Sequence, residues 1–215
     1  DPERIHVIPE GVDTHAFRPL PGDARVSEWR SMNLGADRPF ILYVGKPTER
    51  RNLSSLIHAF GSLRKKNAIP HKLVIAGADL PGSSPFRQVV AEESLSDDVV
   101  VIGYLSHDDL PIVYNAADML VYPSSYEGFG MPVLEAMACG TPVIALDNTA
   151  FPEFAGGVAL LLPDAMPDTL ASGILTVLSN DGQRRHMKAA GPARAGAYDW
   201  RMVTRKYVDL LASLT

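Results

Sequence analysis

The sequence predicts an α/β fold: a doubly wound parallel sheet with helices on both faces. Segments with helical spacing separate short apolar runs, which lie at residues 40–44, 72–76, 99–102, 119–122, 143–146 and 158–162. The runs are continuously apolar, as strands buried on both faces are, and do not alternate as half-exposed strands do. Strands that alternate with helices at short intervals indicate a parallel sheet. Such sheets bind ligands beyond the carboxyl ends of their strands.

The first of these strands leads into a basic loop and a helix. Before it, residues 5–8 form an extended, strand-like run, and residues 26–32 predict a short helix. The strand ends at Gly45, and Asn52 is the predicted cap of the helix that follows. Apolar residues in that helix recur at helical spacing, at Leu53, Leu56, Ile57, Phe60 and Leu63.

The next two strands also end at glycines, Gly77 and Gly103. Residues 85–94 predict a helix between them, and residues 107–117 predict another, with Ser106 as its cap. Because the carboxyl ends of parallel strands meet at one edge of a sheet, we expect these strand ends to line a shared rim.

The most informative stretch is Asp118–Leu146, in which a glycine-bearing turn and a short helix join two buried-strand patterns. The turn lies at residues 128–130, and Pro132 suits the first turn of the helix. Glu127 stands just before the turn, and Glu135 about one turn into the helix. A strand that delivers such a turn to a helix N-terminus aims free N–H groups and the positive end of the helix dipole at one point. That arrangement suits a phosphate.

Two acids beside a phosphate site indicate that the ligand is more than an anion. Glu127 and Glu135 would repel a bare anion, but carboxylates accept hydrogen bonds from vicinal hydroxyls. A ligand that joins a diphosphate to a ribose and a sugar satisfies both requirements. The stretch therefore predicts a nucleotide sugar.

Composition excludes several other classes of function. The 215 residues, 46% hydrophobic and 21% charged, are those of an ordinary globular chain, long enough for one large domain or two small ones. The formal net charge of -5 gives no reason to expect nucleic-acid binding. A single cysteine, Cys139, excludes an internal disulfide and a thiolate metal cluster, and we interpret it as a buried small side chain. No run reaches the roughly 18 apolar residues of a membrane span.

The C-terminal part is predicted to be helical, at residues 168–178, 182–195 and beyond. The last helix carries one apolar stripe, formed by Trp200, Val203, Tyr207, Leu210, Leu211 and Leu214. Two interpretations stay open: the stripe packs on the sheet of this chain, or part of it packs against another portion of a longer protein. The start at Asp1-Pro2, without methionine, favours a cut at a domain boundary.

Together these residues resemble the retaining glycosyltransferases of family 4, which have the GT-B fold, and specifically their C-terminal, donor-binding Rossmann-like domain. The most specific match is the E-x7-E motif Glu127-Gly-Phe-Gly-Met-Pro-Val-Leu-Glu135, followed by residues 136–143. Further matches lie in order at residues 7–13, 42–45 and 117–124. The resemblance implies one nucleotide-sugar-binding domain at residues 1–215 and an N-terminal acceptor domain that is absent from the chain.

The resemblance also implies roles for the acids and the turn. Glu135 would bind the ribose hydroxyls, and Glu127 the hydroxyls of the transferred sugar. Gly128 belongs to the ligand-binding turn, and the candidate backbone N–H donors to phosphate and sugar are those of Phe129, Gly130, Met131 and Val133. Plainer alternatives are a helix-first-turn acid at Glu135, an exposed loop acid at Glu127, and glycines that serve only the turn.

Two cations are expected on the diphosphate. The family has arginine directly after the strand-end glycine and lysine a few residues later, whereas here Lys46 follows Gly45 and Arg51 comes later. Charge is kept, but the guanidinium fork and the ammonium point charge exchange places. A solvated basic loop is the plainer alternative. The resemblance also implies that main-chain groups read the base edge in a pocket formed by Gly103, Tyr104 and Leu105.

The resemblance implies a retaining hexosyltransferase of glycan biosynthesis, which moves a hexose from a nucleotide-diphosphate sugar to an acceptor. Glu127, Lys46 and Arg51 are the predicted catalytic residues. This chain alone, which supplies the donor site, is expected to be inactive. The alternatives are a nucleotide-sugar epimerase of the same fold and a non-catalytic nucleotide-binding domain.

No cofactor and no metal are expected. The six histidines are scattered without metal-ligand spacing, and no Asp-x-Asp pair stands at a strand end, in agreement with the metal independence of GT-B enzymes. The expected partners are the nucleotide sugar and the missing N-terminal domain, and not nucleic acid. We expect a cytoplasmic location, and peripheral association with the inner face of the membrane through the absent half stays open.

Overall fold

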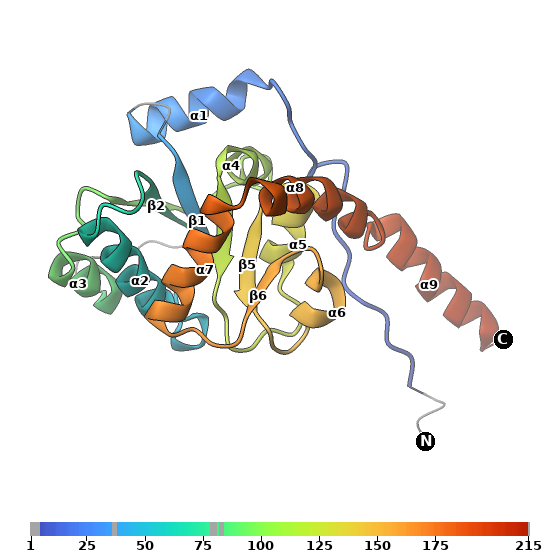
Figure 1. Ribbon diagram of the computed structural model, residues 1–215. Helices are drawn as coiled ribbons and strands as arrows, with labels where there is room; N and C mark the ends of the chain where they lie inside the picture. The colour runs from blue at the N-terminus through green and yellow to red at the C-terminus, as the bar shows by residue number, and fades with distance from the viewer. Residues whose placement is uncertain (1–4, 36–37, 78–80, 82–83, 215) are drawn as a thin grey trace.

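The structure is a computed structural model that describes residues 5–35, 38–77, 81 and 84–214. A six-stranded parallel sheet forms its centre, in the order β3-β2-β1-β4-β5-β6 (Figure 1). The strands are β1 Phe40–Val44, β2 Lys72–Ala76, β3 Val99–Gly103, β4 Met119–Tyr122, β5 Val143–Leu146 and β6 Leu160–Leu162. The predicted doubly wound sheet is confirmed, and only β6 is clearly shorter than expected.

Helices cover both faces of the sheet (Figure 1). One face packs against α2, α3 and α7, and the other against α1, α4, α5 and α6. The remaining two helices follow at the C-terminal end, where α8 contacts both α5 and α7. The α-helices of the described residues are α1 Ala24–Leu34, α2 Leu53–Lys65, α3 Pro85–Glu92, α4 Leu110–Ala116, α5 Met131–Ala138, α6 Phe151–Ala155, α7 Pro167–Ser179, α8 Asp181–Gly196 and α9 Trp200–Ser213.

Burial on both faces explains why the strands read as continuous apolar runs. Every residue of β1, β4 and β5 is buried. Along β1 the side chains alternate between the two core clusters: Phe40 and Leu42 pack on the α4–α5 side, and Ile41 and Tyr43 on the α2–α7 side. The edge strand β3 also packs against both core clusters, but it is only half-buried.

The strand order creates a switch point between β1 and β4. From β1 the chain moves outward through β2 to β3, and it then returns to β4 on the other side of β1. In α/β sheets, ligands bind at such a point, beyond the carboxyl ends of the strands. The loop after β1 carries Lys46 and Arg51, and the loop after β4 carries Glu127. The topology therefore brings the predicted cations and the first predicted acid to the same crevice.

Three local predictions differ from the structure. Residues 5–8 are extended and largely exposed, but they pair with no strand among the described residues. Helix α4 begins at Leu110 and not at residue 107, because a turn comes first, in which the Ser106 hydroxyl accepts the N–H of Asp109 at 3.1 Å. Asn52 precedes α2, but its backbone is left-handed, with φ of 50°, and its side chain makes no capping hydrogen bond.

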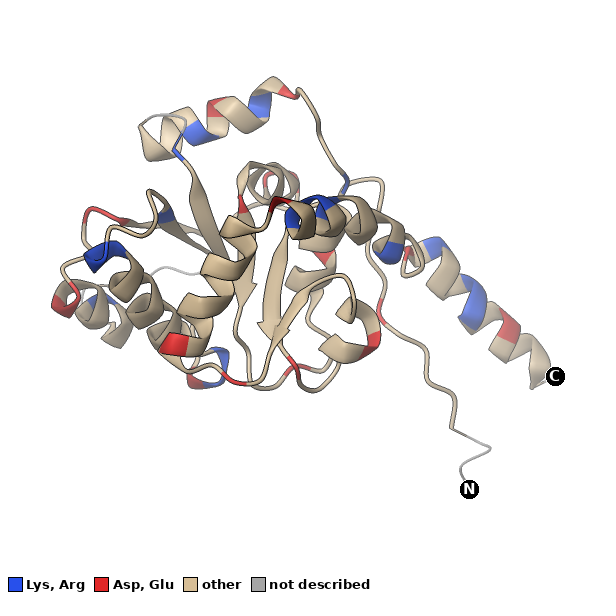
Figure 2. Ribbon diagram, in the orientation of Figure 1, with Lys and Arg blue, Asp and Glu red and all other residues tan. Residues whose placement is uncertain are grey.

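Helix α9 projects from the body of the chain and exposes most of its apolar stripe (Figure 1). Val203 is buried, whereas Tyr207 and Leu211 are 49% and 65% exposed. Basic residues also recur along this helix (Figure 2), at Arg201, Arg205 and Lys206. Packing of the stripe on this chain's own sheet is therefore wrong for most of its length. Packing of part of it against another portion of a longer protein stays a prediction.

Candidate functional site

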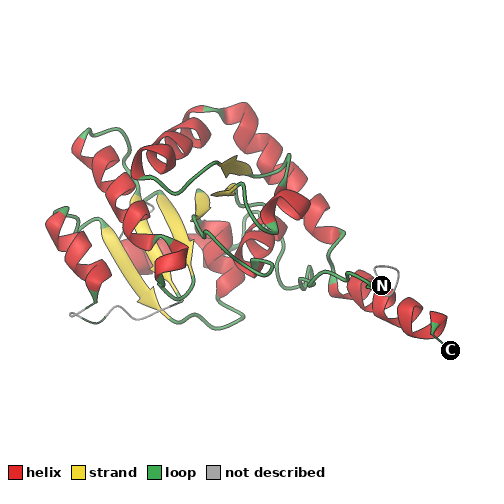
Figure 3. Cartoon of the chain, turned by 90° about the horizontal axis from the view of Figure 1, so that it is seen from below, coloured by secondary structure: helices red, strands yellow, loops and turns green. Residues whose placement is uncertain are grey.

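Hydrogen bonds join the loop after β1 to the loop after β4 at the carboxyl edge of the sheet. This edge is the lower one in Figure 1 and faces the viewer in Figure 3. The N–H of Ser125 donates to the carbonyl of Arg50 at 2.7 Å. The side-chain amide of Asn52 donates to the carbonyl of Pro123 at 2.8 Å and to the hydroxyl of Ser125 at 2.6 Å. The amide that fails to cap α2 therefore joins the basic loop to the loop that carries Glu127.

A pocket of 330 Å³ opens at this edge, where β1, β2 and β3 end and α4 begins. It is lined by Val44, Gly45, Lys46, Arg51, Gly77, Tyr104, Leu105 and Leu110. Five predicted site residues are among them, namely Gly45, Lys46, Arg51, Tyr104 and Leu105. The structure thus brings the two predicted diphosphate cations together with the predicted base pocket.

Gly45 makes room for Arg51 on the pocket wall. The φ of Gly45 is +129°, and a Cβ there would lie 2.5 Å from Nη1 of Arg51. A side chain would therefore strain the backbone and displace the guanidinium. Nη1 also donates to the carbonyl of Lys46 at 3.3 Å. The guanidinium of Arg51 therefore lies across the end of β1, beside Gly45 and bonded to the carbonyl of Lys46.

Glu127 is 9% exposed, so it is not an exposed loop acid. Its Oε1 accepts hydrogen bonds from the Tyr122 hydroxyl at 2.8 Å, the Ser124 hydroxyl at 3.0 Å and Nε of Arg51 at 3.0 Å. Its Oε2 faces Nη1 of Arg50 at 3.5 Å. Burial raises the pKa of Glu127, but the bonds from Tyr122, Arg51 and Ser124 outweigh burial, and the pKa lies below its ordinary value. The acid is therefore ionised and paired with Arg51.

Glu135 lies in α5, where the hydroxyl of Tyr114 in α4 donates to its Oε2 at 2.8 Å. Burial raises the pKa of Glu135, and the Tyr114 bond and the charge of His107 oppose this only in part. Within the described residues no hydrogen bond reaches Oε1. That oxygen is available to the hydroxyl of a ligand, and such a bond would stabilise the ionised form.

The turn before α5 presents free N–H groups. Gly130 has φ of +96°, and a Cβ there would lie 2.4 Å from the ring of Phe151, so only glycine fits. In the part of the chain that the structure describes, the N–H groups of Phe129, Gly130 and Met131 have no protein acceptor, whereas that of Val133 donates to the carbonyl of Gly130 at 3.0 Å. Three of the four predicted backbone donors are therefore free to meet a ligand.

The two other predicted glycines differ from each other. Gly103 closes β3 with φ of +66°, and its carbonyl accepts the N–H of Gly77 at 2.6 Å. Gly128 is exposed, and a Cβ there would meet no other atom within 4 Å. Packing therefore gives no reason for glycine at residue 128.

Three residues that support the acids were not predicted as part of the site: Tyr114, Tyr122 and Ser124. Tyr122 and Ser124 stand two residues apart where β4 ends, and both donate to Glu127. Their spacing follows the period of a strand, which places alternate side chains on one face, and this signal could have found them. Tyr114 lies in a helix 21 residues before Glu135, and nothing local in the sequence links the two.

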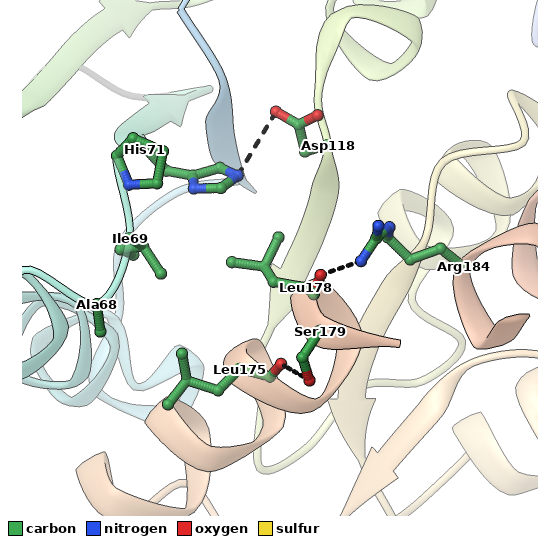
Figure 4. Close-up of a pocket in the computed structure, with 9 residues that line it drawn as sticks. Ala68, Ile69, His71, Asp118, Leu175, Leu178, Ser179 and Arg184 are labelled. Carbon is green, nitrogen blue, oxygen red and sulfur yellow. Dashed lines mark hydrogen bonds and ion pairs between the residues drawn. The ribbon is translucent and has the colours of Figure 1, made fainter. Parts of the chain in front are cut away.

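A larger pocket, of 440 Å³, lies at the opposite, amino-terminal edge of the sheet (Figure 4). His71, Asp118 and Arg184 surround it above apolar side chains such as Leu175 and Leu178. Nδ1 of His71 has no partner among the described residues, and Nε2 lies 3.9 Å from Asp118. Burial lowers the pKa of His71. None of the predicted site residues lines this pocket, so the smaller pocket at the carboxyl edge is the candidate site.

Among the described residues, no group of three His, Cys, Asp or Glu side chains is placed to hold a metal ion. Metal independence stays a prediction. No helix in the same part of the chain has the length and apolarity needed to cross a membrane.

Several curated proteins are similar in sequence. The chain is 32% identical to O-antigen chain mannosyltransferase B of Escherichia coli, over 79% of this chain and 45% of the relative. It is also 32% identical to the MMP alpha-(1->4)-mannosyltransferase of Mycolicibacterium hassiacum, over 96% and 48% respectively. A D-inositol 3-phosphate glycosyltransferase of Kineococcus radiotolerans is 30% identical over 93% and 49%. The chain therefore spans about half the length of these relatives.

Solved structures are similar in fold. Sucrose-phosphate synthase of Thermosynechococcus elongatus superimposes with a TM-score of 0.82 at 29% identity, over 97% of this chain and 52% of that one. The Anabaena protein HepE, in complex with UDP and glucose, has a TM-score of 0.83 at 22% identity, over 99% and 58%. The C-terminal domain of a glycosyl transferase group 1 family protein of Francisella tularensis has a TM-score of 0.74 at 24% identity, over 88% of this chain and all of that domain. The predicted Rossmann-like fold of a GT-B enzyme is confirmed.

The family described as glycosyl transferases group 1 matches residues 27–194. The match includes the basic loop, the pocket at the carboxyl edge and both acids of the E-x7-E motif. It covers well over half of the chain, which therefore belongs to the glycosyl transferases group 1 family.

Proposed function

We propose that this chain is the donor-binding half of a retaining glycosyltransferase of family 4, which transfers a hexose from a nucleotide-diphosphate sugar. One observation carries the proposal: at the carboxyl edge of the sheet, the cations Lys46 and Arg51 lie in one pocket, and Arg51 contacts the buried acid Glu127. Cations at the end of a parallel sheet suit a diphosphate, and a fixed carboxylate beside them suits sugar hydroxyls. The acceptor site belongs to the half that this chain lacks.

Each part of the donor has a partner in this proposal. The diphosphate meets Lys46, Arg51 and the free N–H groups before α5. The ribose hydroxyls donate to Oε1 of Glu135, and the sugar hydroxyls donate to Glu127. The main chain of residues 103–105 reads the base.

Catalysis is electrostatic. Transfer passes through a sugar with oxocarbenium character while negative charge builds on the leaving diphosphate. Lys46, Arg51 and the helix N-terminus are in place before the reaction and stabilise that charge. Loss of one such donor costs about 3 kcal/mol of barrier. Retention follows from front-face attack by the acceptor, and we assign no nucleophile to this chain.

The relatives support this assignment. The named curated relatives are mannosyltransferases and an inositol-phosphate glycosyltransferase, which favours transfer over the epimerase alternative. HepE, a neighbour in fold alone, was solved with UDP and with UDP-glucose. A nucleotide sugar is thus a ligand that this fold accommodates.

Calorimetric titration with UDP, GDP and ADP tests the proposal. We expect saturable binding of at least one of the three. No binding of any of them at millimolar concentration would overturn the donor site and favour a non-catalytic domain. Incubation with the nucleotide sugar alone separates the remaining alternative, because an epimerase forms product without an acceptor.

Two matched variants test the division of roles between the acids. Glu135→Ala is expected to weaken nucleoside diphosphate binding more than Glu127→Ala, because ribose is part of that ligand and the sugar is not. The reverse order would contradict the assignment. We also expect the chain to transfer little or no sugar, and efficient turnover by the chain alone would contradict the assignment of the acceptor site to the absent half.

A further inference from the structure

Arg50 belongs to the basic loop after β1, but it does not line the pocket at the carboxyl edge. Its guanidinium reaches instead to the loop after β4. There Nη1 donates to the carbonyl of Tyr126 at 2.6 Å and faces Oε2 of Glu127 at 3.5 Å. The carbonyl of Arg50 accepts the N–H of Ser125 at 2.7 Å. Both the main chain and the side chain of Arg50 therefore contact residues 125–127.

The two carboxylate oxygens of Glu127 differ in the number of donors that they meet. Oε1 accepts hydrogen bonds from Tyr122, Ser124 and Arg51. A carboxylate has about four lone-pair sites on its two oxygens, so these donors fully occupy Oε1. Within the part of the chain that the structure describes, Oε2 has only the long contact with Arg50. Oε2 is therefore the oxygen that can accept a hydroxyl of the transferred sugar.

Arg50 is placed to fix the direction of Oε2. The distance of 3.5 Å is longer than that of an ordinary hydrogen bond, so the contact leaves room on Oε2 for a ligand. The Arg50 side chain is 46% exposed, but the short bond to the carbonyl of Tyr126 holds Nη1 beside the acid. A cation held there attracts Oε2 and restrains the rotation of the carboxylate.

We propose that Arg50 is a positioning residue for the transferred sugar, which acts through Glu127 and not through the diphosphate. The proposal rests on the proposed donor site and adds a residue to it that belongs neither to the E-x7-E motif nor to the diphosphate pair. It divides the three cations of the basic loop by task. Lys46 and Arg51 serve the diphosphate, and Arg50 orients the acid that receives the sugar hydroxyls.

Calorimetry with matched ligands separates the sugar from the diphosphate. The probes are UDP with UDP-glucose, GDP with GDP-mannose and ADP with ADP-glucose. The measured quantity is the ratio of the Kd of the nucleoside diphosphate to the Kd of its nucleotide sugar. Arg50→Ala is expected to weaken the nucleotide sugar about tenfold, because an interaction with a charged group is lost. The nucleoside diphosphate is expected to bind within about twofold of the wild type, since solvent screens an exposed charge outside the pocket.

Two further variants exclude a general effect of charge or of loop stability. Arg50→Lys keeps the charge and a donor at the end of the side chain, so its ratio is expected to lie within about threefold of the wild-type ratio. Arg25→Ala removes an exposed arginine that pairs with Asp23 ahead of α1, and this matched control is expected to change neither Kd. If Arg50 served only to join the loops, Arg50→Ala would weaken both ligands of a pair equally and leave the ratio unchanged.

A double-mutant cycle shows whether Arg50 acts through Glu127. Glu127→Ala alone is expected to lower the ratio, because the sugar loses its carboxylate. Arg50→Ala added to Glu127→Ala is expected to lower the ratio no further, since the group that Arg50 positions is already gone. Additive losses would mean that Arg50 acts on the sugar independently of Glu127, and the positioning role would be wrong.

The remaining outcomes separate the positioning role from the donor site. If the wild type binds nucleotides and the ratio of Arg50→Ala stays within about twofold of the wild-type ratio, the positioning role is wrong and the donor site stands. If Glu127→Ala leaves the ratio unchanged, Glu127 does not hold the sugar, and the role of Arg50 is wrong with it. If the wild type binds none of the probes, both the donor site and the positioning role are wrong.

Discussion

Glu127 and Arg51 are paired in the structure, although each is assigned to a different part of the donor. Nε of Arg51 donates to Oε1 of Glu127 at 3.0 Å, and the guanidinium has further N–H donors for a diphosphate. Tyr122 and Ser124 also donate to Oε1 of Glu127 and hold the carboxylate in place. Glu127 and a diphosphate therefore compete for the positive charge of Arg51, and the guanidinium can contact both without leaving its position.

Glu127→Gln tests this competition. The amide keeps the shape of the acid but holds Arg51 less strongly, so nucleoside diphosphates are expected to bind about fivefold more tightly. Calorimetry measures the change. Glu49→Gln removes a negative charge from the same basic loop and is the control for net charge. Equal tightening in both variants, or weaker binding in Glu127→Gln, would contradict the competition.

Glu135 is expected to make nucleotide binding depend on pH. Ribose hydroxyls donate to the ionised carboxylate, and burial raises the pKa of this group. Affinity is therefore full above the raised pKa and is lost as the pH falls through it, beginning at a higher pH than an ordinary glutamate would give. Tyr114→Phe removes a bond to the carboxylate, raises the pKa of Glu135 further and moves the loss of affinity to higher pH.

Titrations across a pH series measure this effect. Glu135→Gln cannot ionise at this position, so it retains only the pH dependence of the nucleotide itself and of other groups. Its curve is expected to be flatter than that of the wild type. Curves of the same shape in the two proteins would show that Glu135 does not receive the ribose hydroxyls.

At the scale of elements, two loops form the site and Asn52 holds them together. Asn52→Gly keeps the left-handed backbone, at φ of 50°, and removes the amide that bonds Pro123 and Ser125. We expect it to lower the free energy of unfolding by about 1 kcal/mol. Asn52→Ala removes the same bonds and adds about 1 kcal/mol of backbone strain. Urea unfolding checks the expected order of stability, in which the wild type is followed by Asn52→Gly and then by Asn52→Ala. Equal unfolding free energies in the three proteins would show that the Asn52 amide does not stabilise the contact between the loops.

The strands could be predicted because a strand that is buried on both faces is a continuous apolar run in the sequence. β1, β4 and β5 are buried at every residue, and each was predicted within its observed bounds. The loops have no comparable pattern in the sequence. Asparagine is common both as a helix cap and in left-handed backbone, so the sequence alone does not distinguish the two uses of Asn52. Arg51 and Glu127 are 76 residues apart in the sequence, and they meet only because β1 and β4 are neighbours in the sheet. Local sequence patterns do not reveal the order of strands.

At the scale of the whole molecule, the segment before α1 and the start of α9 meet beside the body. The N–H of Val12 donates to the carbonyl of Tyr198 at 2.8 Å, and the N–H of Trp200 donates to the carbonyl of Val12 at 3.1 Å. The extended N-terminal segment and α9 leave the body from this junction (Figure 1). The curated relatives are about twice as long as this chain. If the chain is the donor-binding half proposed above, we expect the other half to lie on this side.

The exposed face of α9 is the test of that expectation within this chain. Val203 is the buried side chain among the described residues of α9. Val203→Ala opens a cavity there and is expected to cost about 2 kcal/mol of unfolding free energy. Tyr207 and Leu211 contribute little here, because solvent already reaches about half or more of each side chain. Joint replacement of both by serine is therefore expected to change stability by no more than about 0.5 kcal/mol per site. Urea unfolding measures both variants. If the double variant loses as much unfolding free energy as Val203→Ala, the stripe packs on this chain's own body. Packing of the stripe against another portion of a longer protein would then be wrong.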